Sequence, residues 1–74
     1  MTITVIFKGY LKQYTGHREP VSLELAEGAR LEAVFAAFAI PPHLVKFASM
    51  DGAGTMLPKD YALADGDHIV IHPV

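Results

Sequence analysis

Histidine is the residue type in this chain best suited to binding a transition metal, and the sequence contains four. His68 and His72 share one face of an alternating segment, but four residues along a strand span about 13 Å. Zinc holds its nitrogen ligands at about 2 Å, so these two side chains cannot bind the same ion. His17 and His43 lie in segments expected to be loops. We therefore predict no metal site and no bound cofactor, and we interpret the histidines as surface residues.

Two acids flank a glycine in Asp65-Gly66-Asp67, a pairing that could perform acid–base chemistry. Aspartates beside such a glycine are more typical of a turn, because their carboxylates accept hydrogen bonds from nearby backbone N–H groups. Ser49 and Thr55 have no plausible general base near them in the sequence. We find no set of catalytic residues and predict that the chain is not an enzyme.

The composition is that of one small domain covering residues 1–74. An apolar content of 51% is enough for one core, and the lack of cysteine excludes disulfides and thiolate metal sites. The net charge is −2 and the six Lys and Arg residues are scattered, so no basic patch for nucleic acid is visible. No apolar run approaches the roughly 20 residues of a membrane span, and no signal peptide is visible. We expect a cytoplasmic protein that binds neither nucleic acid nor membrane.

Alternation of apolar and polar residues predicts the strands that position these side chains. Strands are expected over residues 2–8, 19–25, 45–50, 55–57 and 68–72. One helix is predicted over residues 30–39, where Leu31, Val34, Phe35 and Phe38 form an apolar stripe. A long connection over residues 9–18 leaves room for a helical turn, and residues 51–54 and 65–67 are predicted turns.

The order of these elements predicts an α+β fold of the ubiquitin-like β-grasp type, with a mixed four- to five-stranded sheet packed on one helix. The helix crossover places the first and last strands side by side and parallel. One helix can cover only one face of the sheet, and the other face meets water or a partner.

The uncovered face of the sheet is the predicted partner-binding surface. Because Ile3, Val5 and Phe7 face the helix, Ile6 must point away from it, and Val70 must do so on the last strand. This surface combines an exposed apolar centre with a polar rim, as partner surfaces do. Its predicted residues are Ile6, Lys8, His68, Val70 and His72. The alternative, ordinary scattered apolar residues on a surface, stays open.

The last twelve residues, 63–74, read Leu-Ala-Asp-Gly-Asp-His-Ile-Val-Ile-His-Pro-Val. This segment resembles the end of the MoaD/ThiS family, which comprises the molybdopterin synthase small subunit and the thiamine-pathway sulfur carrier. The family pattern is Leu-x-x-Gly-Asp, an alternating strand, a proline and a short tail ending in Gly-Gly. Supporting matches are the opening strand 3–7, the turn Glu27-Gly28-Ala29 and the pair Asp51-Gly52.

The resemblance implies a β-grasp fold and a role as a protein cosubstrate. In this family the terminal glycine carboxylate is adenylated by a ubiquitin-activating-like enzyme that uses ATP. It is then converted to a thiocarboxylate that donates sulfur to a cofactor precursor. The implied protein partners are the activating enzyme or a synthase large subunit.

The position of the family's tail is occupied here by Pro73 and Val74, without Gly-Gly. Two functions follow as alternatives. One is a sulfur carrier of molybdopterin or thiamine biosynthesis whose tail has been removed. The other is a tail-less binding module or accessory subunit that docks through the uncovered sheet face.

Overall fold

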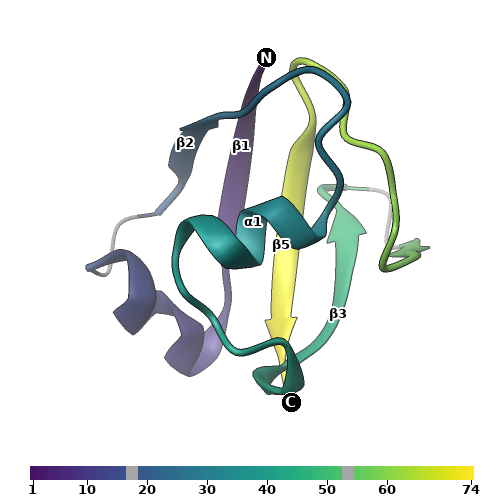
Figure 1. The fold of residues 1–74 in the computed structure, drawn as a ribbon. Helices are drawn as coiled ribbons and strands as arrows, with labels where there is room; N and C mark the ends of the chain where they lie inside the picture. The colour runs from purple at the N-terminus through teal and green to yellow at the C-terminus, as the bar shows by residue number, and fades with distance from the viewer. Residues whose placement is uncertain (17–18, 53–54) are drawn as a thin grey trace.

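A five-stranded mixed sheet in the order β2-β1-β5-β3-β4 forms the framework of the protein, with α1 packed across one side (Figure 1). The computed structural model describes residues 1–16, 19–52 and 55–74. Its elements are β1 (Thr2–Phe7), the 3₁₀ helix η1 (Gly9–Thr15), β2 (Val21–Glu24), α1 (Glu32–Ala37), the 3₁₀ helix η2 (Pro42–Leu44), β3 (Val45–Met50), β4 (Met56–Leu57) and β5 (His68–Pro73). Within these ranges, no helix is long and apolar enough to cross a bilayer.

The two central strands, β1 and β5, run parallel, as the sequence predicted. Val5 pairs with Ile69 and Ile6 with Val70, while β2 and β3 pair antiparallel with the outer edges of β1 and β5. Both central strands are rich in β-branched residues, which pack well on a pleated surface. This arrangement confirms the predicted α+β β-grasp.

The hydrophobic core lies between the sheet and α1. The strand residues facing α1 are almost fully buried: Ile3, Val5, Phe7, Ile69 and Ile71 are 0–1% exposed. On the helix side, Leu31 and Val34 are buried as predicted, whereas Phe35 and Phe38 are half-buried against the core. The Phe38 ring meets the Phe7 ring edge-on, with centroids 5.3 Å apart. The predicted apolar stripe therefore faces the core along its whole length, but its aromatic members lie at the margin.

Helix α1 is two residues shorter at each end than the predicted span of 30–39. At its start, Arg30 forms an isolated bridge with Ala62, and the neighbouring Leu31 N–H donates to the Tyr61 carbonyl at 2.9 Å. At its end, Ala39 adopts a positive φ of 54°. Tertiary hydrogen bonds and a left-handed residue thus end the helix where the alanine-rich sequence would extend it.

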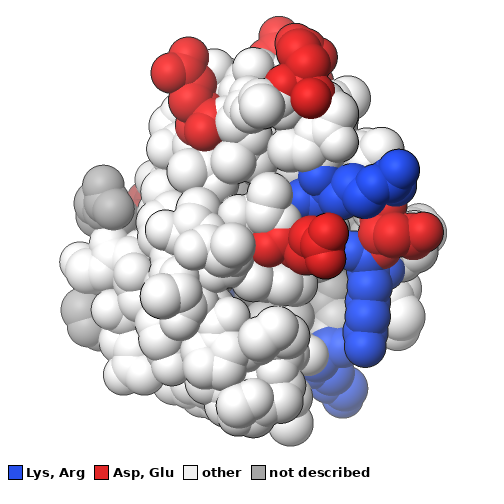
Figure 2. Space-filling model, viewed as in Figure 1, with Lys and Arg blue, Asp and Glu red and all other residues white. Residues whose placement is uncertain are grey.

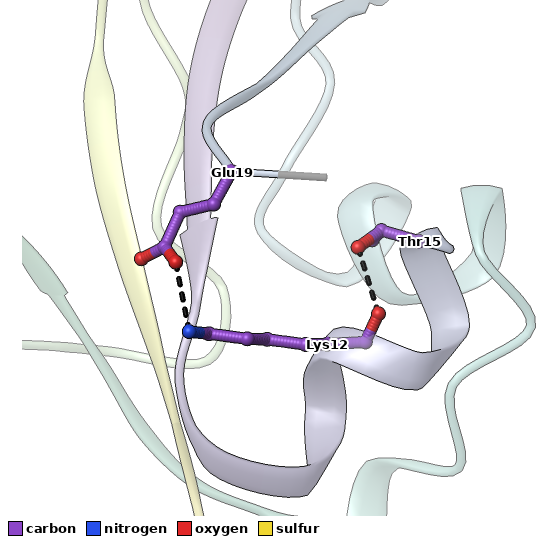
Figure 3. A network of polar contacts seen from close by, with 3 residues as sticks. All are labelled: Lys12, Thr15 and Glu19. Atoms are coloured by element: carbon purple, nitrogen blue, oxygen red, sulfur yellow. Dashed lines mark hydrogen bonds and ion pairs between the residues drawn. The ribbon is translucent and has the colours of Figure 1, made fainter. Parts of the chain in front are cut away.

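The connection between β1 and β2 contains more regular structure than the predicted helical turn, because η1 fills most of it. The Thr15 hydroxyl donates to the Lys12 carbonyl at 3.0 Å, and the Lys12 ammonium lies 2.8 Å from the Glu19 carboxylate (Figure 3). The hydrogen bond from Lys12 lowers the pKa of Glu19. Strand β2 begins at Val21, two residues later than predicted. His17 lies outside the described residues.

The second half of the sheet follows the prediction with two adjustments. The predicted turn over residues 51–54 begins at Asp51 and Gly52, and its other two residues lie outside the described part of the chain. Strand β4 is one residue shorter than predicted. Strand β5 extends one residue beyond the predicted span of 68–72 and includes Pro73, which pairs with Val45 at the end of the strand. A proline is tolerated at such a terminal position, where a missing N–H breaks no internal bond.

Candidate functional site on the outer face of the sheet

The side of the sheet away from α1, here called the outer face, carries the residues predicted to bind a partner. In Figure 1 it is the far side of the sheet, because α1 lies in front. Ile6 on β1 pairs with Val70 on β5, and Val70 pairs on its other side with Ser49 on β3. His68 sits opposite Thr4 in the same register. The register therefore brings Ile6 and Val70 together at the middle of this face, as predicted.

Val70 is not exposed, and that part of the sequence prediction is wrong. Its side chain is 7% exposed, whereas Ile6 is half-buried and Lys8 and His68 are exposed. The reason is topological: β5 is the central strand, so residues of β1 and β3 flank Val70 on both sides. The accessible apolar side chain at the middle of the outer face is consequently Ile6, with the largely buried Val70 beside it on β5.

A hollow of about 330 Å³ opens beside Val70 on the outer face. Its walls include Lys8, Phe47, Ser49, Asp51, Val70 and His72. This volume is at the lower end of the range of about 300–1,000 Å³ typical of ligand pockets. An apolar floor with a cation and an anion in its walls suits one bulky side chain of a protein partner better than a large cofactor.

His72, one of the predicted rim residues, is held in place by β3. Its ring stacks on Phe47 with centroids 4.2 Å apart and an interplanar angle of 15°. Its Nε2 lies 3.2 Å from the Ser49 hydroxyl oxygen. Sequence reasoning missed both contacts, because the phase of the third strand was uncertain and its pairing with β5 cannot be read from spacing. The only signal was the presence of an aromatic residue in a predicted strand.

The Ser49–His72 pair does not form a nucleophilic site. Ser49 is 5% exposed, so a substrate has little access to its hydroxyl. Among the described residues, no carboxylate hydrogen-bonds to His72, whereas a serine nucleophile needs a base that is oriented by a third group. The pair acts as a structural bond between β3 and β5.

The histidines do not assemble into a metal centre in the described ranges. His68 is exposed and His72 half-buried on the same face, and His43 lies apart in η2. No group of three or more metal-ligating side chains is found among the described residues.

Asp65 and Asp67 are turn residues, as their spacing indicated. The Thr2 backbone N–H donates to Asp65 Oδ1 at 2.7 Å, and the Tyr61 hydroxyl donates to Asp67 Oδ2 at 3.2 Å. Gly66 has a φ of 85°, a conformation that a side chain would strain. Burial raises the pKa of Tyr61, and the negative charge of Asp67 raises it further. The bond from Thr2 to Asp65 fastens the turn before β5 to β1 and so helps to fix the register of the outer face.

The chain end is fastened to the two 3₁₀ helices. The Val74 backbone N–H donates to the Leu44 carbonyl at 2.9 Å, and the Tyr10 hydroxyl is 3.4 Å from both the Leu44 and the Val74 carbonyl oxygens. Gly9 approaches Pro73 so closely that a Cβ there would lie 3.0 Å from the proline ring. The backbone at Pro73 and Val74 is thereby fixed, while the Val74 side chain is 72% exposed.

Comparison with solved structures shows the same fold in small ubiquitin-like proteins. SAMP1 from Haloferax volcanii superposes with a TM-score of 0.71 at 16% identity, covering 100% of this chain and 96% of that one. A protein assigned as molybdopterin converting factor subunit 1, from Pyrococcus furiosus, gives 0.76 at 19% identity, covering 99% and 97%. A ubiquitin-like protein from Caldiarchaeum subterraneum gives 0.52 at 22% identity, covering 100% and 96%.

No protein-family model matches the chain, and no curated protein sequence is significantly similar to it. These three similarities are below 25% identity, so they show the ubiquitin-like β-grasp fold alone.

Proposed function

We propose that the protein is a small ubiquitin-like protein related to the sulfur carriers of molybdopterin or thiamine biosynthesis, and that its outer face docks a protein partner. The observation that supports this is the pairing of Ile6 with Val70 beside a hollow of about 330 Å³, rimmed by Lys8 and His72. The partner implied by the family resemblance is an activating enzyme or a synthase large subunit.

The outer face and the chain end are close enough to be engaged by one partner. The Lys8 backbone N–H donates to the Ile71 carbonyl at 3.0 Å, so the rim of the face lies at the end of β5. Val74 is three residues further, about 10 Å of extended chain. A partner that binds Lys8 can therefore place its own catalytic groups at the chain end.

The chemistry proposed for a carrier is activation of its terminal carboxylate by the partner. A carboxylate is a poor electrophile, so one of its oxygens first attacks the α-phosphorus of ATP and pyrophosphate leaves. The resulting acyl-adenylate has AMP as a leaving group, which a sulfur nucleophile displaces to give the thiocarboxylate. In this proposal the chain supplies the carboxylate and the docking face, and the enzyme supplies the catalysis.

Two matched chains test the carrier function. One ends at Val74, and the other continues after Val74 with Gly-Gly. Each is incubated with ATP and the ubiquitin-activating-like enzyme of the same organism, and the products are measured by mass spectrometry. We expect an AMP adduct on the extended chain and none at Val74. An adduct at Val74 would show that Gly-Gly is not required, and no adduct on either chain would contradict the carrier function.

The alternative is a tail-less binding module that uses the outer face and performs no chemistry. It is favoured by the fact that the outer face is formed by side chains of β1, β3 and β5 and needs no residue beyond Val74. Docking at the outer face is required by both functions. It is tested by measuring how tightly the activating enzyme or the synthase large subunit binds the Lys8→Glu and Ile6→Asp proteins. We expect the binding affinity to fall about thirtyfold for a substitution at the centre of the interface.

A control for docking is Gln13→Glu, which adds a negative charge at an exposed residue of η1 that lines neither hollow. Val70→Asp is unsuitable, because that side chain is buried and its replacement would disturb folding. If Lys8→Glu and Ile6→Asp proteins bind like the parent and the Gln13→Glu control, the outer face is not the docking surface.

A further inference from the structure

A second and more apolar hollow lies on the helix side of the sheet, between α1 and the β3–β4 edge. In Figure 1, α1 crosses in front of β1 and β5, whereas β3 and the chain after β4 lie beyond the N-terminal end of the helix. The hollow, here called the groove, has a volume of about 370 Å³. Leu31, which precedes α1, and Phe35 of α1 form one wall, Val45 belongs to β3, and Leu57 belongs to β4. A mostly apolar hollow of this size is typical of a binding site.

Two lysines in the walls of the groove have no anionic partner. Lys46 and Lys59 both line it, and both are exposed. In the described part of the chain the one ion pair joins Lys12 to Glu19, in the connection between β1 and β2, whereas the groove lies at the β3–β4 edge of the sheet. Figure 2 shows that the basic side chains visible on the helix side gather at the edge beyond the helix, with acidic side chains among them. Glu32 also lines the groove, so its walls carry two cations and one anion, a net positive charge in a chain whose net charge is −2.

The sheet beside the groove is open for an extended chain. Strand β4 pairs only with Ala48 and Ser49 of β3 in the described residues, so the first half of β3 reaches beyond the end of β4. Extended peptides bind proteins by running alongside such strand edges, and side-chain pockets then give the specificity. Met56, which also lines the groove, is 67% exposed and offers an adaptable apolar contact.

We propose that the groove binds an acidic peptide segment of a partner protein, with one bulky apolar side chain in the hollow and carboxylates on either side of it. The apolar side chain would cover Phe35, Val45 and Leu57, and the carboxylates would pair with Lys46 and Lys59. This proposal does not depend on the sulfur-carrier function or on the outer face, since the two lysines belong to the groove alone. Phe47 contributes to both hollows and is left unchanged in the test.

The test selects peptides from a phage-displayed library of random dodecapeptides on the immobilised 74-residue protein. An enriched peptide is then synthesised with a fluorescent label, and its affinity is measured by anisotropy. We expect the enriched sequences to share a bulky apolar residue flanked by Asp or Glu. Lys46→Glu and Lys59→Glu should each weaken binding severalfold, and together about tenfold or more. Rising salt should weaken binding to the parent protein, because exposed charges are screened.

Gln13→Glu is the control, because it adds a negative charge at an exposed residue of η1 that lines neither hollow. It should leave the peptide affinity unchanged, and all variants should have the urea midpoint of the parent. Lys8→Glu makes the same charge change as the groove variants, but on the outer face. If Lys8→Glu weakens binding while the groove variants do not, the peptides bind the outer face and the groove proposal is wrong, although docking at the outer face would then be supported. Enriched peptides without acidic residues, or no enrichment, would also overturn the proposal.

A small anionic amphiphile is the competing occupant, and dodecanoate is the probe for it. Amide chemical shifts are recorded during titration with dodecanoate and, separately, with the selected peptide. The proposal requires the peptide to shift the amides of Lys46 and Lys59 at lower concentration than dodecanoate. Shifts at the groove with dodecanoate alone would assign it to a small amphiphile and contradict peptide binding.

Discussion

The two faces of the β1–β5 pair are built from alternating residues of the same strands, yet they reach burial by different routes. Toward α1, Val5 and Ile69 are 0% exposed because a helix covers them. On the outer face, no helix lies over Ile6 and Val70, which are half-buried and 7% exposed. Val70 is covered by its strand neighbours alone. A central strand can therefore bury a side chain without a second layer, while residues one strand away stay accessible.

The largest expected effect is on the helix side. Phe7→Ala should lower the free energy of unfolding by about 3–5 kcal/mol, because the ring is fully buried and its removal leaves a cavity beside Phe38. A small domain holds only about 5 kcal/mol in total, so this variant should be largely unfolded. Urea denaturation followed by circular dichroism measures it. Phe35→Ala, at a half-buried position, should cost less, and equal losses for the two would show that the core buries both rings to the same extent.

The next effect is expected at the buried position of the outer face. Val70→Asp should destabilise the fold by on the order of 3 kcal/mol, because an unpaired charge would be desolvated there. Ile6→Asp, in the same row of the sheet, should cost clearly less since water can reach it. Urea denaturation of the two variants measures this difference in stability. If Val70→Asp is as stable as Ile6→Asp, neighbouring strands do not bury Val70 as described and the two faces differ more than we conclude.

The sequence predicted the helix-side face well and the outer face in part, for a physical reason. A period of two assigns Ile3, Val5 and Phe7 to one side of a strand wherever that strand is placed. The burial of Val70 depends instead on which strands flank it, a property of topology and register. The third strand adds a register shift between Val45 and Phe47, which no local pattern announces.

The same limit explains the contacts that sequence reasoning missed. The stack of Phe47 on His72 joins residues far apart in the chain, and it exists because β3 pairs with β5 in that shifted register. The groove on the helix side results from the shortness of β4 and of α1, and element ends are the features that sequence patterns fix least well. The turn at Asp67 was predictable because its chemistry is local: the Ala64 N–H donates to Asp67 Oδ2 at 2.9 Å. The bond from Thr2 to Asp65 joins residues at opposite ends of the chain and could not be read from the spacing.

A smaller effect on stability is expected at His72, whose side chain contacts β3 on the outer face. His72→Ala should reduce the free energy of unfolding by about 1 kcal/mol, because it removes the stack on Phe47 and leaves the Ser49 hydroxyl without this partner. Thermal or urea unfolding measures the change. His72→Phe can keep the stack without the hydrogen bond, so it should recover part of the loss. No loss for His72→Ala would mean that the ring is as dispensable as an ordinary surface residue.

The smallest effect on stability is expected at His68, the residue before the fully buried Ile69. Its side chain is exposed on the outer face, so His68→Ala should change the free energy of unfolding by no more than about 0.5 kcal/mol. The backbone carbonyl of His68 accepts a 2.9 Å bond from the Asp51 N–H, and alanine retains that bond. Ile69→Ala at the adjacent, fully buried position should instead cost about 2–5 kcal/mol. The two residues are neighbours in β5, so a difference in stability between the two variants reports the direction in which each side chain points. Similar urea midpoints for the two variants would contradict the assignment of these residues to opposite faces.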